Sequence, residues 1–229
     1  MQNTRKNTRT LFLFEHLLMP FTKFQQINES VAIGLWHIEE PLAFFQKAFS
    51  AYANKDLTNV LQTRNECKQT ERLAARLCLK NLLLSLKEDY SGLEKNSDCV
   101  PRLLQSPLFP SISHTKNLAC AAVHQSCPAG IDIEPVHPKV GRVAHKFVHP
   151  DEESFIDDLE KQTLLWTIKE AVYKRMQIRG LLFKEEIVAQ PFLLKEEGIL
   201  QVQVQKASKQ KVSVFYKKIE NCFLSVTLD

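Results

Sequence analysis

Apolar residues repeat with two different periods along this chain, and the change of period limits the folds that the chain can adopt. In residues 70–87 and again in residues 161–176, apolar residues recur every three or four positions, which predicts two long helices. After Gly180 the period falls to two, and in residues 199–204 apolar residues alternate with glutamines. That alternation predicts an antiparallel sheet with one buried face and one solvent-exposed face.

The remaining expected elements are shorter. We expect the chain after Gly180 to form a meander of about four strands, at residues 187–194, 199–204, 212–216 and 222–228. Earlier in the chain we expect strands at 31–38 and 118–123, a helix at 41–55, helical pieces at 140–147 and 150–159, and a proline-punctuated loop at 88–111. The strand at Asp132 follows the run 118–123 closely enough to predict a hairpin between them.

A strand, a long helix and further strands occur twice in this order, which indicates an α+β protein built from two similar lobes. We expect an N-terminal lobe at residues 19–115 and a C-terminal lobe at 116–229, meeting near residues 112–125. Residues 1–18 are basic and threonine-rich and lack the long apolar core of a secretory signal. We interpret them as a disordered or non-native extension, which leaves open whether Met1 or Met19 is the true start.

Composition excludes several classes of protein. The net charge of +4 on 229 residues favours anionic ligands or an acidic partner, but it is far from the dense basic surface of a nucleic-acid binder. The six cysteines form no Cys-x-x-Cys pair and show no zinc-ligand spacing, so we expect free thiols and a cytoplasmic protein. No apolar run is long enough for a transmembrane helix, and we expect no membrane partner.

The segment Gly130-Ile131-Asp132-Ile133-Glu134 has the pattern of a short strand. Because side chains alternate between faces, Asp132 and Glu134 point the same way and the two isoleucines point the other way. Two carboxylates on one face form a simple site for Mg²⁺, which prefers oxygen ligands. The alternative is an edge strand with a solvated acidic face, and five residues alone do not decide between the two.

Two further groups of polar residues have both a functional and an ordinary interpretation. Ser113-His114 is either a binding element or a surface pair, and Lys169-Glu170 with Lys174 is either part of a site or a helical charge pair worth a few tenths of a kcal/mol. A basic stripe on the helix at 70–87 is either a solvated face or an anion site at the rim of a cleft. Its members are Arg72, Arg76 and Lys80.

Taken in order, these groups resemble a known family. The order Ile-Ser-His, then Gly-Ile-Asp-Ile-Glu, then Trp-x-x-Lys-Glu-Ala-x-x-Lys is similar to the 4′-phosphopantetheinyl transferase superfamily, and within it to the long, single-chain type that activates peptide and polyketide synthases. The resemblance covers roughly residues 30–217. Supporting segments are Leu-Ala-Ala-Arg at 73–76, the run from Lys146 to Glu152, Leu-Phe-Lys-Glu at 182–185 and Pro-Phe at 191–192.

The resemblance implies a fold, a reaction and a set of site residues. The fold would be a pseudo-dimer of two α+β lobes, and the reaction would move the 4′-phosphopantetheine arm of coenzyme A to a serine of an apo carrier protein, as a holo-[acyl-carrier-protein] synthase does. The implied metal is Mg²⁺, with Mn²⁺ as an alternative, held by Asp132, Glu134 and Glu170. The implied catalytic residues are Glu170, Lys174 and Asp132, and the implied coenzyme A-binding residues are Arg76, Lys80, Ser113, His114, Lys169 and Lys174.

Several points stay open at this level. The base that takes the serine proton is either Glu170 or a metal-bound water held by Glu134. The partner would be an acidic, helical carrier protein, and two lobes in one chain would make a complete site in a monomer. Two other functions remain possible: a different Mg²⁺-dependent phosphoryl-transfer enzyme, which would act without a carrier protein, and a catalytically idle module that binds carrier proteins.

Overall fold

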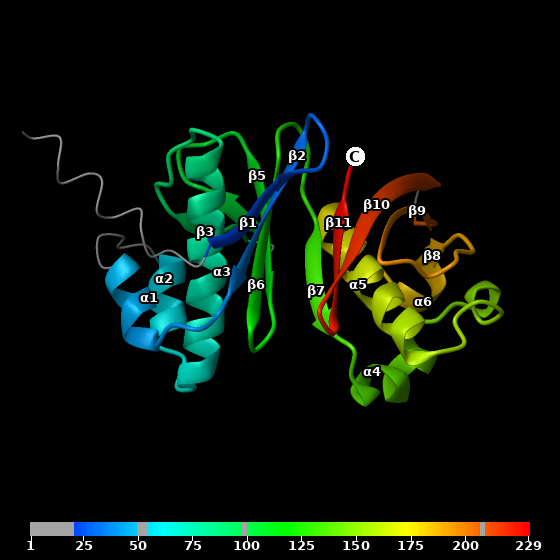
Figure 1. Cartoon of the computed structure of the whole chain (residues 1–229). Coiled ribbons are helices and arrows are strands. Elements are labelled where there is room, and N and C mark those ends of the chain that lie inside the picture. The colour runs from blue at the N-terminus through cyan, green and yellow to red at the C-terminus, as the bar shows by residue number, and fades with distance from the viewer. Residues whose placement is uncertain (1–20, 50–54, 98–99, 207–208) are drawn as a thin grey trace, which may run out of the picture.

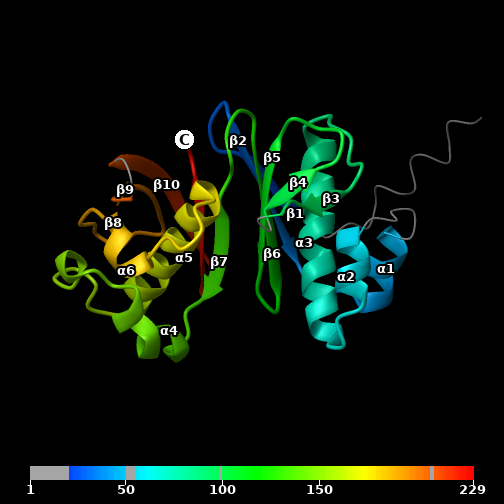
Figure 2. The ribbon, with the colours of Figure 1, turned by 180° about the vertical axis from the view of Figure 1, so that it is seen from behind.

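The computed structural model describes residues 21–49, 55–97, 100–206 and 209–229. The predicted extension at residues 1–18 lies outside them. The described chain forms layers in the order helix, sheet, sheet, helix (Figure 1). Helix α3 (Glu66–Ser85) covers the outer face of the first sheet and helix α5 (Leu159–Met176) covers the outer face of the second, and the view from behind shows the same order (Figure 2).

The first sheet has four antiparallel strands in the order β1-β2-β6-β5. Their bounds are β1 Phe21–Gln26, β2 Val31–His37, β5 Phe109–His114 and β6 Leu118–His124. Strands β2 and β6 lie in the centre, and their residues are almost all buried. This agrees with the unbroken apolar pattern of both segments, which is typical of strands covered on both faces.

The second sheet has five antiparallel strands in the order β7-β11-β10-β9-β8. Their bounds are β7 Ile131–Pro135, β8 Ile187–Ala189, β9 Glu197–Val204, β10 Gln210–Ile219 and β11 Cys222–Thr227. The predicted four-strand meander is therefore confirmed. The predicted α+β class, with antiparallel sheets and long helices, is confirmed as well.

Shorter elements complete the described chain. They are α1 (Leu42–Phe49), α2 (Lys55–Leu61), β3 (Leu93–Lys95), β4 (Pro101–Leu103), α4 (Pro138–Val143), α6 (Phe183–Glu186) and two 3-10 turns (Ala144–Lys146 and Pro150–Glu152). The loop predicted at 88–111 was wrong in part, because β3 and β4 pair there as a small sheet of their own. The predicted helix at 41–55 contains α1, and part of it lies outside the described residues.

The predicted hairpin between the run 118–123 and the strand of Asp132 was wrong. Strand β6 pairs with β2 and β5 in the first sheet, whereas β7 pairs with β11 at the edge of the second. The chain therefore changes sheets between β6 and β7. The expected lobe boundary after residue 115 would separate β5 from β6, which are hydrogen-bonded neighbours. Short-range proximity suggested a hairpin, but β7 lies in the second sheet, where Ile131, Asp132 and Ile133 are buried.

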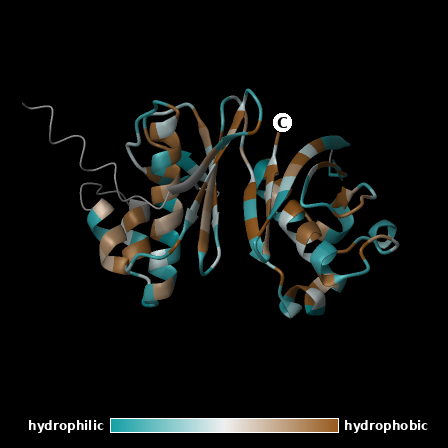
Figure 3. Cartoon of the chain, viewed as in Figure 1, coloured by the Kyte–Doolittle hydropathy of each residue, from teal (hydrophilic) through white to brown (hydrophobic). Residues whose placement is uncertain are grey.

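Three buried clusters hold the layers together, and Figure 3 shows how apolar and polar residues alternate along the elements that form them. One lies between the first sheet and its helices, one between the second sheet and α5, and the third between the two sheets. The third cluster includes Ile131 and Ile133 of β7 together with Val31 and Ile33 of β2. None of the described helices is both long and apolar enough to cross a membrane.

Candidate active site

Asp132 is the centre of the polar contacts between the two sheets. Its Oδ1 accepts hydrogen bonds from Nζ of Lys174 at 2.7 Å and from Oγ of Ser113 at 2.8 Å. Nζ of Lys174 also donates to the carbonyl oxygen of Ile131 at 2.8 Å. Residues from β5, β7 and α5, which are far apart in the sequence, therefore meet at one carboxylate that is only 4% exposed.

The close approach of β7 to α5 depends on Gly130. A Cβ atom at this position would lie 1.9 Å from the carbonyl oxygen of Ala171, so no larger residue fits against the helix backbone. Along β7, Ile131 and Ile133 enter the cluster between the sheets, and Asp132 is left on the face that meets Lys174 of α5. The side chains of β7 therefore alternate between its two faces as predicted, and this alternation orients the acids.

Glu134 and Glu170 lie in the same electrostatic environment as Asp132. Burial, and then the negative charge of Asp132, raise the pKa of Glu134, while a hydrogen bond with Trp166 and the charge of Lys174 oppose the shift. Burial, and then Asp132, raise the pKa of Glu170 to about 7, with Lys174 opposing and Glu134 adding to the effect. Three carboxylates thus repel one another around the end of one lysine.

These residues fit a divalent cation. Oδ2 of Asp132 is buried and has no hydrogen-bond partner among the described residues, which is costly for a carboxylate oxygen unless something positive binds there. In the described part of the chain, no three His, Cys, Asp or Glu side chains lie close enough together to hold a metal ion by themselves. Mg²⁺ keeps several waters and also takes substrate phosphates as ligands, so the carboxylates that hold it need not be grouped before it binds.

A cleft of about 830 Å³ opens beside this group of acids. Ser113 and Lys174 belong to both, because each lines the cleft and each bonds to Asp132. Several other lining residues carry or can carry positive charge: Arg72, Arg76, Lys95, His114 and Arg179. A basic cleft that ends at a group of carboxylates suits a phosphorylated ligand whose far end reaches a metal.

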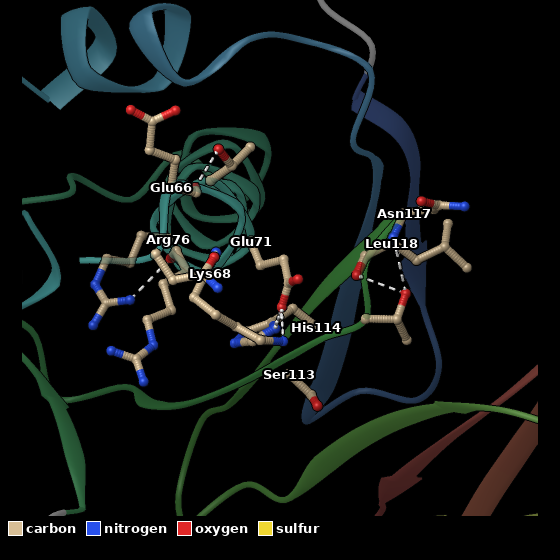
Figure 4. Close-up of polar contacts among 12 residues, drawn as sticks. Glu66, Lys68, Glu71, Arg76, Ser113, His114, Asn117 and Leu118 are labelled. Atoms are coloured by element: carbon tan, nitrogen blue, oxygen red, sulfur yellow. Dashed lines mark hydrogen bonds and ion pairs between the residues drawn. The ribbon is translucent and has the colours of Figure 1, made fainter. Parts of the chain in front are cut away.

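On the α3 side of the cleft, three side chains form a charged network, which Figure 4 shows between α3 and β5. Oε2 of Glu71 lies 2.6 Å from Nζ of Lys68 and 3.1 Å from Nδ1 of His114. Glu71 is 4% exposed, so a buried acid stands within an otherwise basic face. Arg76, also on α3, donates from a guanidinium nitrogen to the carbonyl oxygen of Arg72 at 2.9 Å.

The structure brings most of the predicted site residues together. Asp132, Glu134, Glu170 and Lys174 form the acidic group and its lysine, and residues of the cleft wall include Ser113, His114 and Arg76. Within the described chain, the cleft lining does not include Lys80, which lies about one turn beyond Arg76 on α3.

Lys169 does not lie in the site at all. Its side chain is 0% exposed, and its Nζ bonds to Oε2 of Glu152 at 2.7 Å and to the carbonyl oxygens of Phe147 and Phe183 at 2.6 and 3.0 Å. Three acceptors satisfy all three donors of an ammonium group. Lys169 was predicted to bind coenzyme A because it is next to Glu170 in the sequence. Adjacent residues of a helix point about 100° apart, however, so the side chain of Lys169 points away from the site.

Sequence reasoning missed several residues around the cleft. Glu71 was not considered, although a glutamate next to a stripe of basic residues on one helix indicates a possible ion pair. Tyr173 and Arg179 line the cleft and follow Glu170 along the chain, yet no pattern distinguished them from ordinary helix and loop residues. Trp166 was noted only as part of a motif, and its contact with Glu134 depends on tertiary structure.

Comparison with known proteins gives a match to one protein family and no match to a curated protein. The family model of the 4′-phosphopantetheinyl transferase superfamily matches residues 128–223, a segment that runs from just before β7 into β11 and contains all four residues of the acidic group and its lysine. No curated protein matches the chain. Residues 128–223, which carry the three acids and the lysine on β7 and α5, therefore match a domain of the 4′-phosphopantetheinyl transferase superfamily.

Proposed function

We propose that this chain transfers the 4′-phosphopantetheine arm of coenzyme A to a serine hydroxyl of an apo carrier protein, in a Mg²⁺-dependent reaction. The second product is adenosine 3′,5′-bisphosphate. One observation carries the proposal: Lys174 lines the basic cleft and at the same time bonds to Asp132, so a bound pyrophosphate and the carboxylates would meet at one point.

The cleft suits the anionic part of coenzyme A. Arg76 and His114 on its wall would contact phosphate groups, and a guanidinium is well shaped for a phosphate because it donates in a planar fork. The hydroxyl of Ser113 has one proton, which it donates to Asp132 in this structure. Ser113 could donate a hydrogen bond to a phosphate only after its bond to Asp132 is broken. We therefore assign Ser113 first to holding Asp132 and second to binding the ligand.

Asp132, through its unpartnered Oδ2, would hold the metal together with Glu134 and Glu170. When bound, Mg²⁺ would offset the charge of the pyrophosphate and make the attacked phosphorus more electrophilic. The serine oxygen would form a bond to that phosphorus while the bond to the leaving adenosine bisphosphate breaks. Lys174 would offset the negative charge that develops on the leaving group.

The serine proton must pass to a base during this step. Glu170 is the first candidate, because it belongs to the acidic group beside the cleft, where burial and the neighbouring acids raise its pKa to about 7 in the metal-free chain. A water molecule held by Glu134 is the alternative base. Replacing Glu170 with Gln tests the two, since a water held by Glu134 would still accept the proton in that variant.

The partner we propose is an acidic, helical carrier protein. Exposed basic residues on the cleft rim, Arg72, Lys95 and Arg179, would attract such a partner and steer its approach. We further propose that the chain acts as a monomer in the cytoplasm. The cysteines that the structure describes are free thiols, which suits a reducing compartment, and one chain supplies all the residues assigned to the site.

The deciding experiment is mass spectrometry of an apo acyl carrier protein and an apo peptidyl carrier protein, each incubated with the full chain, coenzyme A and Mg²⁺. We expect a mass gain of one phosphopantetheine arm on the carrier serine, and no gain when EDTA replaces Mg²⁺. Cleavage of coenzyme A or a nucleotide without a carrier would indicate a different phosphoryl-transfer enzyme. Binding of carriers without any mass gain would indicate an idle binding module.

A further inference from the structure

Glu71 has no part in the mechanism derived so far, yet it is a buried acid in contact with His114, which lines the cleft. Its side chain is 6% exposed, and its Oε2 lies between Lys68 and His114, at 2.6 and 3.1 Å from their nitrogens. Burying an ionised carboxylate without partners is costly, so such an acid is normally paired. At Glu71 both partners are cations or potential cations, and one of them lines the cleft.

The geometry restricts what His114 can do. Its Nδ1 is buried and lies 3.1 Å from Oε2 of Glu71, at the distance of an ion pair and without the alignment of a regular hydrogen bond. A proton on Nδ1 is therefore met by the carboxylate, which leaves Nε2 as the ring nitrogen for a ligand in the cleft. In a neutral imidazole, a proton on Nδ1 leaves Nε2 with a lone pair, which repels a phosphate oxygen.

His114 must therefore be doubly protonated to donate to a phosphate from Nε2. Burial lowers the pKa of His114, Glu71 opposes that shift, and the charges of Lys68 and Arg72 add to it. All three of these charged residues come from α3. On β6 the residue paired with His114 is Ala119, and on β7 the carboxylate of Asp132 is bonded to Ser113, the neighbour of His114 in sequence.

We propose that Glu71 is a positioning residue that makes His114 bind the phosphate of coenzyme A as an imidazolium, with a proton taken from solvent when the ligand binds. The proton is added at the ring nitrogen that faces the ligand, the Nδ1 proton is held toward Glu71, and the carboxylate supplies the balancing negative charge. This inference rests on the proposed function, because it takes coenzyme A as the ligand of the cleft.

Isothermal titration calorimetry with the full chain tests the proposal. Adenosine 3′,5′-bisphosphate is titrated at pH 8 in buffers of different ionisation enthalpy, because both of its phosphomonoester groups are then almost fully ionised and contribute no proton. We expect the wild-type chain to take up close to one proton per ligand. In Glu71→Gln we expect the uptake to fall toward zero and Kd to rise about tenfold, since the imidazolium loses its counter-charge.

Two controls separate this role from a general effect on the fold. Glu66→Gln makes the same change on an exposed glutamate of the same helix and should leave Kd and proton uptake unchanged. In a His114→Gln background, Glu71→Gln should have no further effect on Kd, because Glu71 acts through the imidazole. A purely structural role for Glu71 would weaken binding equally in both backgrounds.

The outcomes distinguish the two levels of the argument. Equal affinity and equal proton uptake in wild type and Glu71→Gln would overturn this inference and leave the proposed function intact. Ligand binding by the wild-type chain with no proton uptake would also overturn it. A wild-type chain that binds neither coenzyme A nor adenosine 3′,5′-bisphosphate would overturn the proposed function, and this inference with it.

Discussion

Nζ of Lys174 lies 2.7 Å from Oδ1 of Asp132, and this contact joins the long helix α5 to the edge strand β7. About 30% of the lysine side chain is exposed to the cleft. Burial lowers the pKa of Lys174, but the charge of Asp132 and the hydrogen bond to it outweigh that effect and raise the pKa above its ordinary value. Lys174 is therefore a permanent cation at the point where the basic cleft reaches the acids.

Replacing Asp132 with Asn should abolish transfer without unfolding the chain. The variant loses the metal-binding carboxylate and the negative partner of Lys174, and we expect kcat to fall by at least about 100-fold, the scale seen when one electrostatic group is removed from an active site. The measurement is the rate of mass gain on a carrier protein. Asp157→Asn, an exposed aspartate that pairs with Lys161, is the matched control and should retain full activity.

Replacing Glu170 with Gln should stabilise the metal-free chain at pH 8 while it reduces transfer. The pKa of Glu170 in the folded chain is about 7, against an ordinary value of 4.5, so the folded state binds this proton more tightly than the unfolded state does. The stabilisation from this group is therefore complete below pH 4.5 and is lost as the pH rises through 7. Thermal unfolding of metal-free wild type and variant at pH 6 and pH 8 measures the difference.

The same pKa predicts that Mg²⁺ stabilises the wild-type chain more at pH 8 than at pH 6. A metal competes with the proton for the carboxylate, and at pH 6 most of Glu170 is protonated before the metal arrives. We expect a clear rise of Tm with Mg²⁺ at pH 8, a smaller rise at pH 6, and little rise at either pH in Asp132→Asn. A larger rise at pH 6 would contradict the assignment of Glu170 as a ligand.

Replacing Lys169 with Met should reduce stability and leave coenzyme A affinity unchanged in the folded fraction. The Lys169–Glu152 pair is fully buried, and removing one partner of such a pair typically costs about 3–5 kcal/mol. Urea unfolding gives the free energy, and calorimetry with coenzyme A gives Kd. Lys161→Met changes a partly exposed lysine of the same helix, whose partner Asp157 is exposed, and it should cost about 1 kcal/mol or less. A large rise in Kd for Lys169→Met alone would restore Lys169 to the binding site.

Replacing Gly130 with Ala should destabilise the chain and lower transfer together. The added methyl group would collide with the backbone of α5 at Ala171, and overpacking of this kind costs about 1–3 kcal/mol or more. Moving α5 away from β7 also separates Lys174 from Asp132. Gly141→Ala is the matched control, because its nearest atom beyond the local helix backbone belongs to the flexible side chain of Gln162, at 3.1 Å. Tm and kcat should both stay close to wild type in the control.

Much of the fold follows from local patterns in the sequence. The period of three to four predicted α3 and α5, and the period of two predicted the meander from β8 to β11. Both helices also carry local signals at their starts, since the side chains of Asn65 and Asp158 cap the first backbone N–H groups. Such signals depend on near neighbours and are visible without the tertiary structure.

The pairing of strands did not follow from local patterns. Strand β7 follows β6 by only a few residues, yet it pairs with β11, about ninety positions later. The hairpin was expected because short connections are common between antiparallel strands. The choice between the two partners depends on which sheet can bury Ile131 and Ile133 and also bring Asp132 to α5, and that is a property of the assembled layers.

The site divides in the same way. The sequence by itself determined that Asp132 and Glu134 share one face of a strand and that Glu170 and Lys174 share one face of a helix, because both relationships depend only on backbone period. Only the tertiary structure decided that these two faces meet, that Lys169 is turned away into the core, and that Glu71 lies against His114. Burial and packing between distant segments set those contacts, and a pattern along the chain carries no information about which distant segment will be the neighbour.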